Sequence, residues 1–352
     1  MFQPPRCPHF FCPHHRDPTT AFFRVHGHYR PKCRPHPVPR FRCTSCRRTF
    51  SRQTFRMDYR DHRPDLNARL FQLLSSGIGL RQSSRLLRLS LRCTELKFRK
   101  IARHLRRLNL NLRQSLTPGA SFQLDELESY EGRRNARPLS IPVVIETKSR
   151  FIAWAESATI RPRGKMTPSR RLAIEEDEAR FGRRRDRSRR SVLRTFRRAA
   201  DLSGRLREVL LETDRKSSYE GLAVRAFGST RLVHRKTSSR LPRTVANPLF
   251  PINHTEAMAR DLMGRLRRKS WLASKKRRYL DLGLQVFMAF RNLVRRRFNF
   301  DRESPAQRLG FVHRRMGWEE ALSWRQDWGG QSIHPLAFAA ESVESRLSAE
   351  RR

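Results

Sequence analysis

Apolar residues recur at helical spacing in the first half of the chain, over residues 64–116. A spacing of three and four residues predicts amphipathic helices. Glycines and a Leu-Ser-Leu step interrupt the pattern at residues 77–79 and 89–91, and a Thr-Pro-Gly step ends it at residues 117–119. The pattern therefore predicts three short helices followed by a linker.

The pattern changes after this linker to short apolar runs with strand character. The expected strands are residues 121–124, 141–147, 151–157, 208–213 and 230–234, and the second and third are close enough to form a hairpin. Helical stretches are expected at residues 168–203, 253–264 and 276–297. Three strands followed by alternating helices and strands predict an α/β fold, with a mixed sheet flanked by helices.

The first 58 residues have little helical periodicity but hold five of the six cysteines. Cys7 and Cys12 form one pair, and Cys43 and Cys46 form a second pair about thirty residues later. Two closely spaced pairs can close a tetrahedral structural Zn²⁺ site. Other residues could replace one of these ligands, namely Cys33, His9, His14, His15, His26 and His28.

These patterns divide the chain into four parts. Residues 1–58 are expected to form a zinc ribbon, and residues 59–118 a three-helix unit of the helix-turn-helix kind. Residues 119–300 form the mixed α/β domain, with a basic insertion at about 161–204. Residues 301–352 have no clear period, and we expect a peripheral or poorly ordered tail.

The charge of the chain narrows the possible partners. Lys and Arg number 77 against 32 Asp and Glu, so the formal net charge is +45. A charge this large predicts binding to a polyanion. No apolar run reaches the roughly 18 residues that span a bilayer, and the first residues lack signal-peptide character. We therefore expect a cytoplasmic protein with no membrane partner, whose cysteines are metal ligands or free thiols.

Basic residues gather in two places, on the third predicted helix and in the segment that follows Glu256. The helix at about residues 92–105 is expected to enter a DNA groove, although a spacer with a solvated basic face is the alternative. The residues expected to contact DNA are Arg92, Lys97, Arg99, Lys100, Arg103, Arg260, Arg267, Arg268 and Lys269.

Three acidic positions suggest chemistry on that polyanion. Asp125 and Asp214 each stand at the end of a predicted strand, and Glu256 lies on a predicted helix further along. Carboxylates gathered at one rim of a sheet repel one another unless a divalent cation such as Mg²⁺ (or Mn²⁺) holds them. Two such ions can promote phosphodiester chemistry.

The three blocks around these acids resemble the signatures of bacterial insertion-sequence transposases with an RNase H-like fold. The blocks are residues 124–126, 212–214 and 253–256, and the second cysteine pair with its aromatic and basic neighbours at residues 41–50 is similar to the zinc-ribbon branch of that family. The resemblance implies an RNase H-like catalytic domain of the Asp-Asp-Glu class. It further implies a magnesium-dependent DNA transposase that acts at terminal inverted repeats and on target DNA, as a homo-oligomer on DNA in the bacterial cytoplasm.

The sequence leaves two questions open. Some members of the family place Glu, and others Asn, at the position of Asn253, so Asn253 and Glu256 compete for the role of third ligand. The alternative function is a catalytically inactive DNA-binding regulator or a decayed transposase, and an RNA-binding or ribosome-associated protein would account for the charge alone.

Overall fold

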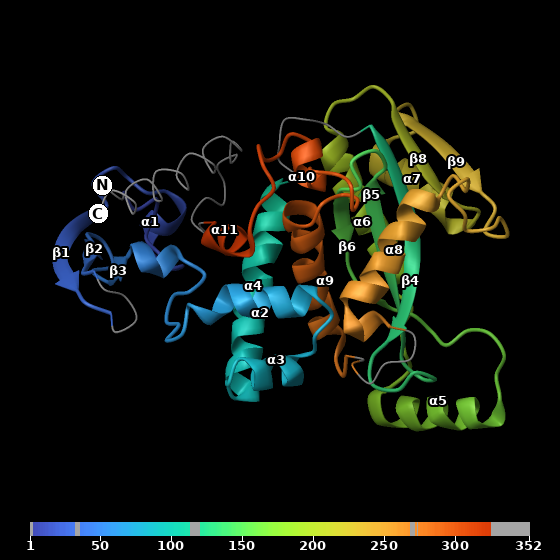
Figure 1. The fold of residues 1–352 in the computed structure, drawn as a ribbon, viewed down its shortest axis with the longest axis horizontal. Helices are drawn as coiled ribbons and strands as arrows, with labels where there is room; N and C mark the ends of the chain where they lie inside the picture. Colours follow the sequence, from blue (N-terminus) through green and yellow to red (C-terminus); the bar gives the residue numbers. More distant parts are fainter. Residues whose placement is uncertain (1–2, 32–35, 113–119, 268–271, 273, 325–352) are drawn as a thin grey trace.

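A computed structural model describes residues 3–31, 36–112, 120–267, 272 and 274–324 of the chain. A small cysteine-containing module at one end is followed by a group of helices and then by the main sheet (Figure 1). Within the described residues, no helix is both long enough and apolar enough to cross a membrane.

The N-terminal module is a three-stranded antiparallel sheet with a core of its own. Strand β2 lies between β1 and β3, and four phenylalanines pack behind the cysteines, namely Phe22, Phe41, Phe50 and Phe55. So small an apolar core stabilises little by itself, which is why a metal is expected here. The elements are β1 (Phe23–Tyr29), α1 (Pro13–Arg16), β2 (Val38–Cys43), β3 (Thr49–Ser51) and η1 (Arg52–Phe55).

The three predicted helices are present, but they are not a separate unit. They are α2 (Leu66–Ser75), α3 (Leu80–Leu86) and α4 (Leu91–Leu112). Buried side chains of α4, including Phe98, Ile101 and Leu105, belong to the same hydrophobic core as the sheet. Helix α4 therefore serves as a core helix along most of its length.

The main sheet has the strand order β6-β5-β4-β8-β9, and β7 pairs with β5 beside β6. β4, β5 and β6 are antiparallel neighbours, whereas β8 and β9 run parallel to β4. Three antiparallel strands followed by two parallel ones give the RNase H-like order, so the predicted fold class is confirmed. The strands are β4 (Ser121–Tyr130), β5 (Pro138–Glu146), β6 (Ile152–Ala155), β7 (Ala158–Thr159), β8 (Val209–Asp214) and β9 (Leu232–Thr237).

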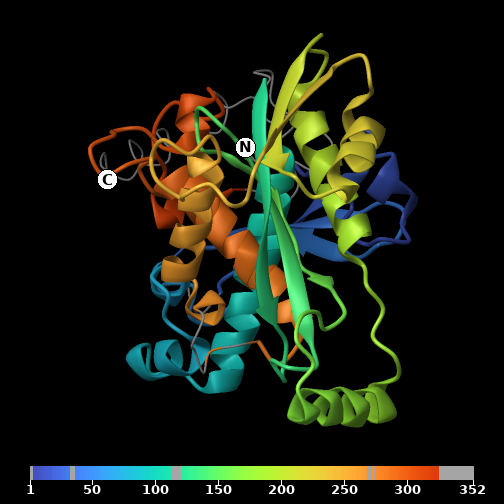
Figure 2. The same ribbon diagram turned by 90° about the vertical axis from the view of Figure 1, so that its right-hand side faces the viewer.

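Helices cover both faces of this sheet (Figures 1 and 2). One face carries α6 (Ser188–Ser203) and α7 (Ser218–Phe227), and the other carries α8 (Phe250–Leu262) and α9 (Arg277–Ala289). The short turn η2 (Gly264–Leu266) follows α8, and a π-helical turn η3 (Phe290–Val294) extends α9.

The segment expected as one long basic insertion is two helices with different surroundings. Helix α6 buries Val192, Phe196 and Ala199 against the sheet, so it belongs to the core. Helix α5 (Pro168–Phe181) buries only Asp177 and stands away from the sheet (Figure 2). The insertion is therefore confined to α5 and the segments that lead to and from it.

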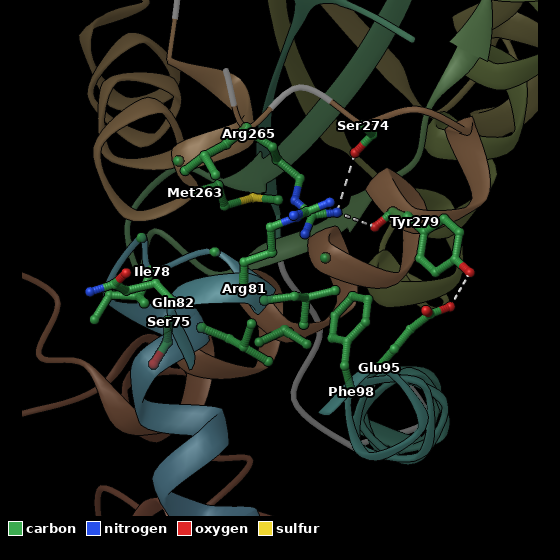
Figure 3. A pocket seen from close by; sticks show the side chains of 18 of the residues that line it. Ser75, Ile78, Arg81, Gln82, Glu95, Phe98, Met263, Arg265, Ser274 and Tyr279 are labelled. Carbon is green, nitrogen blue, oxygen red and sulfur yellow. Dashed lines mark hydrogen bonds between the residues drawn. The ribbon is translucent and has the colours of Figure 1, made fainter. Parts of the chain in front are cut away.

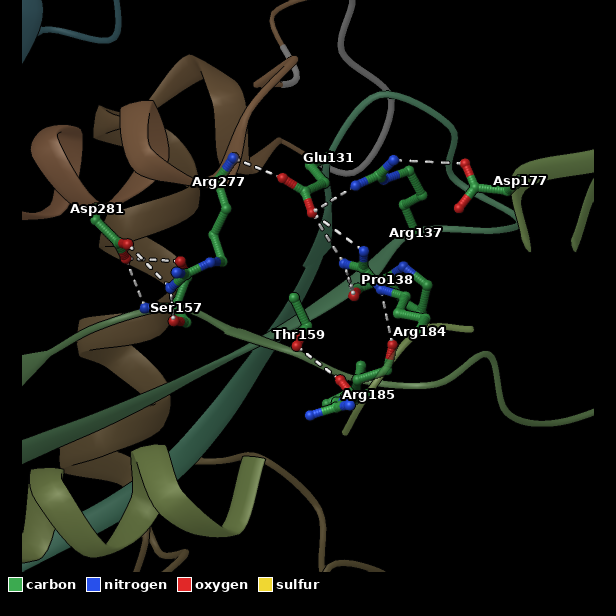
Figure 4. Close-up of polar contacts among 11 residues, drawn as sticks. Glu131, Arg137, Pro138, Ser157, Thr159, Asp177, Arg184, Arg185, Arg277 and Asp281 are labelled. Atoms are coloured by element: carbon green, nitrogen blue, oxygen red, sulfur yellow. Dashed lines mark hydrogen bonds and ion pairs between the residues drawn. The ribbon is translucent and has the colours of Figure 1, made fainter. Parts of the chain in front are cut away.

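A buried carboxylate ties these segments to the sheet (Figure 4). Glu131 Oε1 accepts hydrogen bonds from both terminal nitrogens of Arg184, each at 3.1 Å, and Oε2 accepts one from the backbone N–H of Arg277 at 2.6 Å. Arg137 forms an ion pair with Asp177 of α5 at 3.6 Å. Glu131 thus joins the region after β4, the return from α5 and the start of α9.

Residues 301–324 are not the peripheral tail that the sequence predicted. The short helices α10 (Pro305–Arg308) and α11 (Trp318–Ser323) and the residues beside them bury Ala306, Phe311 and Trp324 in the main core. His104 of α4 also forms a hydrogen bond with the carbonyl oxygen of Ala321, at 2.9 Å. This part was missed because its apolar residues are irregularly spaced, and residues 325–352 lie outside the described part.

Candidate functional site

Pairing between β4 and β8 sets Asp125 beside Asp214. The parallel pairs run from Ser121 with Leu210 to Leu124 with Thr213, and the two aspartates are the next position on each strand. Residues in the same row of a sheet point to the same face. Both carboxylates therefore project from one face, at the end of the apolar part of the strands.

Helix α8 covers that face and is fixed there by Gln123. The Gln123 Oε1 atom accepts the backbone N–H of Ile252 at 3.1 Å, and its Nε2 donates to the Pro248 carbonyl at 2.7 Å and to Glu212 at 2.8 Å. Asp125 is two residues beyond Gln123, or roughly 6.7 Å along the strand. Glu256 is four residues beyond Ile252, or roughly 6 Å along the helix. These two distances from the Gln123–Ile252 hydrogen bond are nearly equal, so Glu256 lies over Asp125.

The electrostatics of the three acids agree with this placement. Burial raises the pKa of Asp125, and the nearby Asp214 raises it further, although the Glu126 N–H opposes the shift with a hydrogen bond of 2.7 Å. Burial and the charge of Asp125 raise the pKa of Glu256 to about 8. Without a cation, this site therefore favours a protonated Glu256 at neutral pH.

One carboxylate oxygen of Glu256 accepts no hydrogen bond from the described residues. Its side chain is 2% exposed, and Oε1 is buried without a hydrogen-bond partner in that part of the chain. Its Oε2 lies 3.7 Å from an Arg260 nitrogen. A buried carboxylate oxygen without a partner is costly. Oxygen ligands gathered in this way suit Mg²⁺ or Mn²⁺, so the donor set fits a hard divalent cation.

Asn253, the rival for the third position, lies in the turn before Glu256. It is partly exposed, whereas Glu256 is buried against the sheet. The neighbouring His254 faces away from the acids, toward Phe250 and Phe298. Burial and the nearby Arg291, Arg150 and Arg295 lower the pKa of His254.

Two residues that the sequence did not single out support the acids. Glu126 points to the opposite face of β4, where it accepts hydrogen bonds from Ser140 Oγ at 2.6 Å and Tyr219 Oη at 2.9 Å, and it pairs with Lys216. The backbone N–H of Lys216 in turn donates to Asp214 Oδ1 at 3.1 Å. Glu126 thereby positions the loop that follows Asp214, a role that adjacency to Asp125 could have suggested.

The second unforeseen residue is a cation next to the acids. Arg243 comes from the segment between β9 and α8, and its charge lowers the pKa of both Asp125 and Glu256. The segment has no periodic pattern, so sequence reasoning had no signal for its position.

The four cysteines that the sequence predicts as zinc ligands come together in the N-terminal module. The sulfur atoms of Cys7, Cys12, Cys43 and Cys46 all lie within 4.8 Å of one another, with Cys7 3.6 Å from Cys46 and Cys12 3.7 Å from Cys43. A tetrahedral Zn²⁺ with bonds of about 2.3 Å requires sulfur atoms about 3.8 Å apart. The sulfur positions therefore fit zinc.

The chemical state of the four thiols also favours a metal. All four are free rather than disulfide-bonded. Burial raises the pKa of the Cys7 and Cys43 thiols. At Cys12 burial also raises the pKa, but hydrogen bonds from the His14 backbone and from Cys43 lower it overall. Several neighbouring thiolates are therefore disfavoured unless a cation is bound. No histidine belongs to the group within the described residues, where His15 Nδ1 instead bonds the Cys7 carbonyl at 2.8 Å. Cys33 lies outside those residues.

The basic residues of α4 divide between interior and surface. Lys97 was expected to contact DNA, but its ammonium group is buried. It forms an ion pair with Asp61 at 2.6 Å and donates hydrogen bonds to Asn67 and to the Arg63 carbonyl. Lys100 donates to the Tyr59 carbonyl at 2.7 Å.

The other predicted cations of α4 lie nearer the surface. Arg99 pairs with Glu95 and also bonds Tyr279 of α9. Arg92 and Arg103 are exposed. A helix that contributes to the core cannot lie deep in a major groove along its whole length, so only its exposed side chains are available to DNA.

The basic block after Glu256 is partly interior as well. Arg265 extends into a cavity of about 580 Å³ between α2, α3, α4 and α9 (Figure 3). Its guanidinium donates to the Tyr279 carbonyl at 2.6 Å and to Ser274 Oγ at 3.2 Å, and burial lowers its pKa to about 10. Gly264 allows this close packing, since a Cβ there would lie 2.6 Å from the Gly77 carbonyl oxygen.

The remaining cations of that block differ in position. Arg260 lies beside Glu256, and Arg267 is exposed and donates to the Asp261 carbonyl at 3.1 Å. Arg268 and Lys269 lie outside the described residues.

Comparison with known proteins gives few matches. No protein-family model matches the sequence, and no curated protein matches it. Among solved structures, the pre-cleavage Mos1 transpososome is similar with a TM-score of 0.22 and 12% identity, over 73% of this chain and 77% of that one.

Two further Mos1 structures give the same result. The strand transfer complex has a TM-score of 0.21 and 11% identity over 73% and 76% of the two chains, and the mariner paired end complex with Mn has 0.21 and 12% over 75% and 79%. Scores this low establish neither fold nor activity, so the fold assignment depends on the strand order of the main sheet.

Proposed function

We propose that this chain is a DNA transposase of the Asp-Asp-Glu class, which cleaves a phosphodiester at a transposon end and joins the freed 3′-hydroxyl to target DNA. The observation that carries the proposal is the convergence of Asp125, Asp214 and Glu256 on one face of an RNase H-like sheet. A DNA-binding regulator would have no need for three mutually repelling carboxylates beneath a helix.

The residues of the chain hold the site in place. Asp125 and Asp214 present their carboxylates from a rigid sheet, Gln123 sets the height of α8, and Glu256 closes the site from above. A pair of Mg²⁺ or Mn²⁺ ions, when bound, would activate the attacking oxygen and stabilise the leaving one. Preorganised ligands on strands and a helix are suited to such chemistry because they need little rearrangement.

The proposed partners follow from the charge. Transposon terminal inverted repeats and target DNA are the proposed ligands, bound through phosphate contacts from exposed arginines. We further propose that the chain acts as a homo-oligomer on DNA in the bacterial cytoplasm, and that Zn²⁺ at the four cysteines has a structural role.

Variants of Glu256 and Asn253 test which of these two residues is the third metal ligand. We expect Glu256→Gln to lose most Mg²⁺-dependent cleavage, roughly 100-fold, because it removes a buried charge from the metal site. Asn253→Ala is expected to cost less than about fivefold, since Asn253 is partly exposed and one turn away. The measurement is single-turnover cleavage of duplexes that carry the terminal repeats flanking the gene, with and without Mg²⁺.

Wild-type protein serves as the reference in this assay and tests the function itself. It should nick these duplexes and join the 3′-end to target DNA only when Mg²⁺ or Mn²⁺ is present. Tight binding without nicking would favour the inactive regulator, and a larger loss in Asn253→Ala than in Glu256→Gln would exchange the roles of the two residues.

A further inference from the structure

A basic cleft lies at the edge of the sheet opposite β9. A cleft of about 790 Å³ is formed there by α4, α6, α9 and the edge strand β6, with Trp154 in its lining. Helices α6 and α9 cover opposite faces of the sheet, so the cleft passes around the edge. It combines side chains of α4 with side chains of the sheet and of the helices that cover it.

The cleft carries an excess of positive charge. Seven arginines and three acidic residues line it, and each acid already has an arginine partner. Arg194 pairs with Glu156 at 2.6 Å, Arg198 with Asp201 at 3.4 Å and Arg277 with Asp281 at 3.2 Å, the last of these visible in Figure 4. The pairs fix three guanidinium groups and neutralise all the negative charge of the cleft.

Four arginines are left over. Arg103, Arg106, Arg197 and Arg278 are exposed, and none of them forms a hydrogen bond or ion pair with the described part of the chain. They come from α4, α6 and α9, so like charges face one another across the opening. Such charges repel in the free protein and bind an anion that lies between them. Guanidinium groups in particular form bidentate hydrogen bonds with phosphate.

Strand pairing places this cleft relative to the acids. Ala155 pairs with Val143, and Val143 pairs with Asp125, so Asp125 and the end of β6 stand in one row of the sheet. Two strand spacings separate them, or about 10 Å. A B-DNA duplex is wider than this, so one bound DNA molecule can reach both the acids and the cleft.

We infer that the cleft binds the phosphodiester backbone of duplex DNA and holds it beside the acids without taking part in the cleavage step. The inference rests on the DNA-binding part of the proposed function, and it moves Arg103 from a groove-reading helix to a composite backbone site. Contacts of this kind fix position and carry no base information. Binding through this cleft should therefore be independent of sequence.

The test is the salt dependence of DNA binding by full-length protein that carries Arg103→Gln, Arg106→Gln and Arg197→Gln together. Fluorescence anisotropy with a labelled duplex of about 30 base pairs, with no Mg²⁺ added, excludes any contribution from cleavage. Each lost phosphate contact reduces the slope of log K against log salt by roughly 0.9. We expect the slope to fall by about 2 to 3 and affinity at about 0.15 M salt to fall at least about tenfold.

Two matched variants separate the cleft from charge in general. Arg171→Gln, Arg225→Gln and Arg235→Gln together remove the same charge from exposed positions outside the cleft, and we expect their slope to change by less than about 1. Changing the three cleft arginines to Lys retains charge, so it should preserve most of the slope. Circular dichroism and thermal unfolding of each variant check that the fold is intact.

The outcomes are distinct from those of the cleavage assay. Equal losses in the cleft variant and the outside variant, or no loss in either, would overturn the cleft assignment even if wild-type protein cleaves DNA. A selective loss in the cleft variant supports it even if no cleavage is found. Should the Gln variant fail to fold, loss of affinity by Arg197→Gln alone, compared with Arg225→Gln, decides the question.

Discussion

Asp125→Asn is expected to reduce Mg²⁺-dependent DNA cleavage by more than about 100-fold, since changes merely adjacent to metal ligands already cost roughly 10- to 100-fold. Asp125 is the central acid of the site, because it interacts with both Asp214 and Glu256. Asn keeps the shape of the side chain and removes its charge. The measurement is the single-turnover cleavage rate at saturating protein.

DNA binding supplies the internal control for this variant. Affinity measured without Mg²⁺ should stay within about threefold of wild type, since phosphate contacts by arginines supply most of it. Glu175→Gln, on the exposed part of α5, makes the same carboxylate-to-amide change away from the sheet and should cleave normally. Cleavage by Asp125→Asn at the wild-type rate would exclude Asp125 from catalysis.

Cys43→Ser is expected to release the metal and unfold the N-terminal module. Structural Zn²⁺ sites contribute an apparent free energy of roughly 10–16 kcal/mol to folding, and the module has only a small aromatic core to replace it. Purified wild-type protein should contain one Zn²⁺ per chain, and the variant much less. Limited proteolysis should then cut residues 3–58 while the main domain stays protected.

Cys93→Ser is the matched control. Cys93 is exposed on α4 and does not belong to the four-cysteine group, so its replacement should change neither zinc content nor proteolysis. A Cys43→Ser protein that retains one Zn²⁺ per chain and resists protease would refute the proposed site.

Patterns local in the sequence predicted the fold class and the grouping of the cysteines. The apolar runs before Asp125 and Asp214 are short and end at a charge, which is typical of strands that reach a sheet rim. The pairing of β4 with β8 then follows from the RNase H-like strand order. The cysteine pairs were equally informative because the spacing within each pair is short.

Long-range packing was not predictable in the same way. Lys97 looks like any other cation of a basic helix, and only the distant Asp61 makes it interior. The second half of the supposed insertion became a core helix because its Val192 and Phe196 side chains meet the sheet. The basic pattern of that segment concealed a narrow apolar stripe.

Crystals of the protein grown with Mn²⁺ and DNA, with diffraction data collected at the manganese absorption edge, would test the proposed metal site most directly. We predict two anomalous peaks about 3.5–4 Å apart, in contact with the carboxylates of Asp125 and Asp214 and with Glu256 as the third ligand. Carboxylates separated by more than about 10 Å with no manganese between them would contradict the proposed site, because such groups could not share a metal pair.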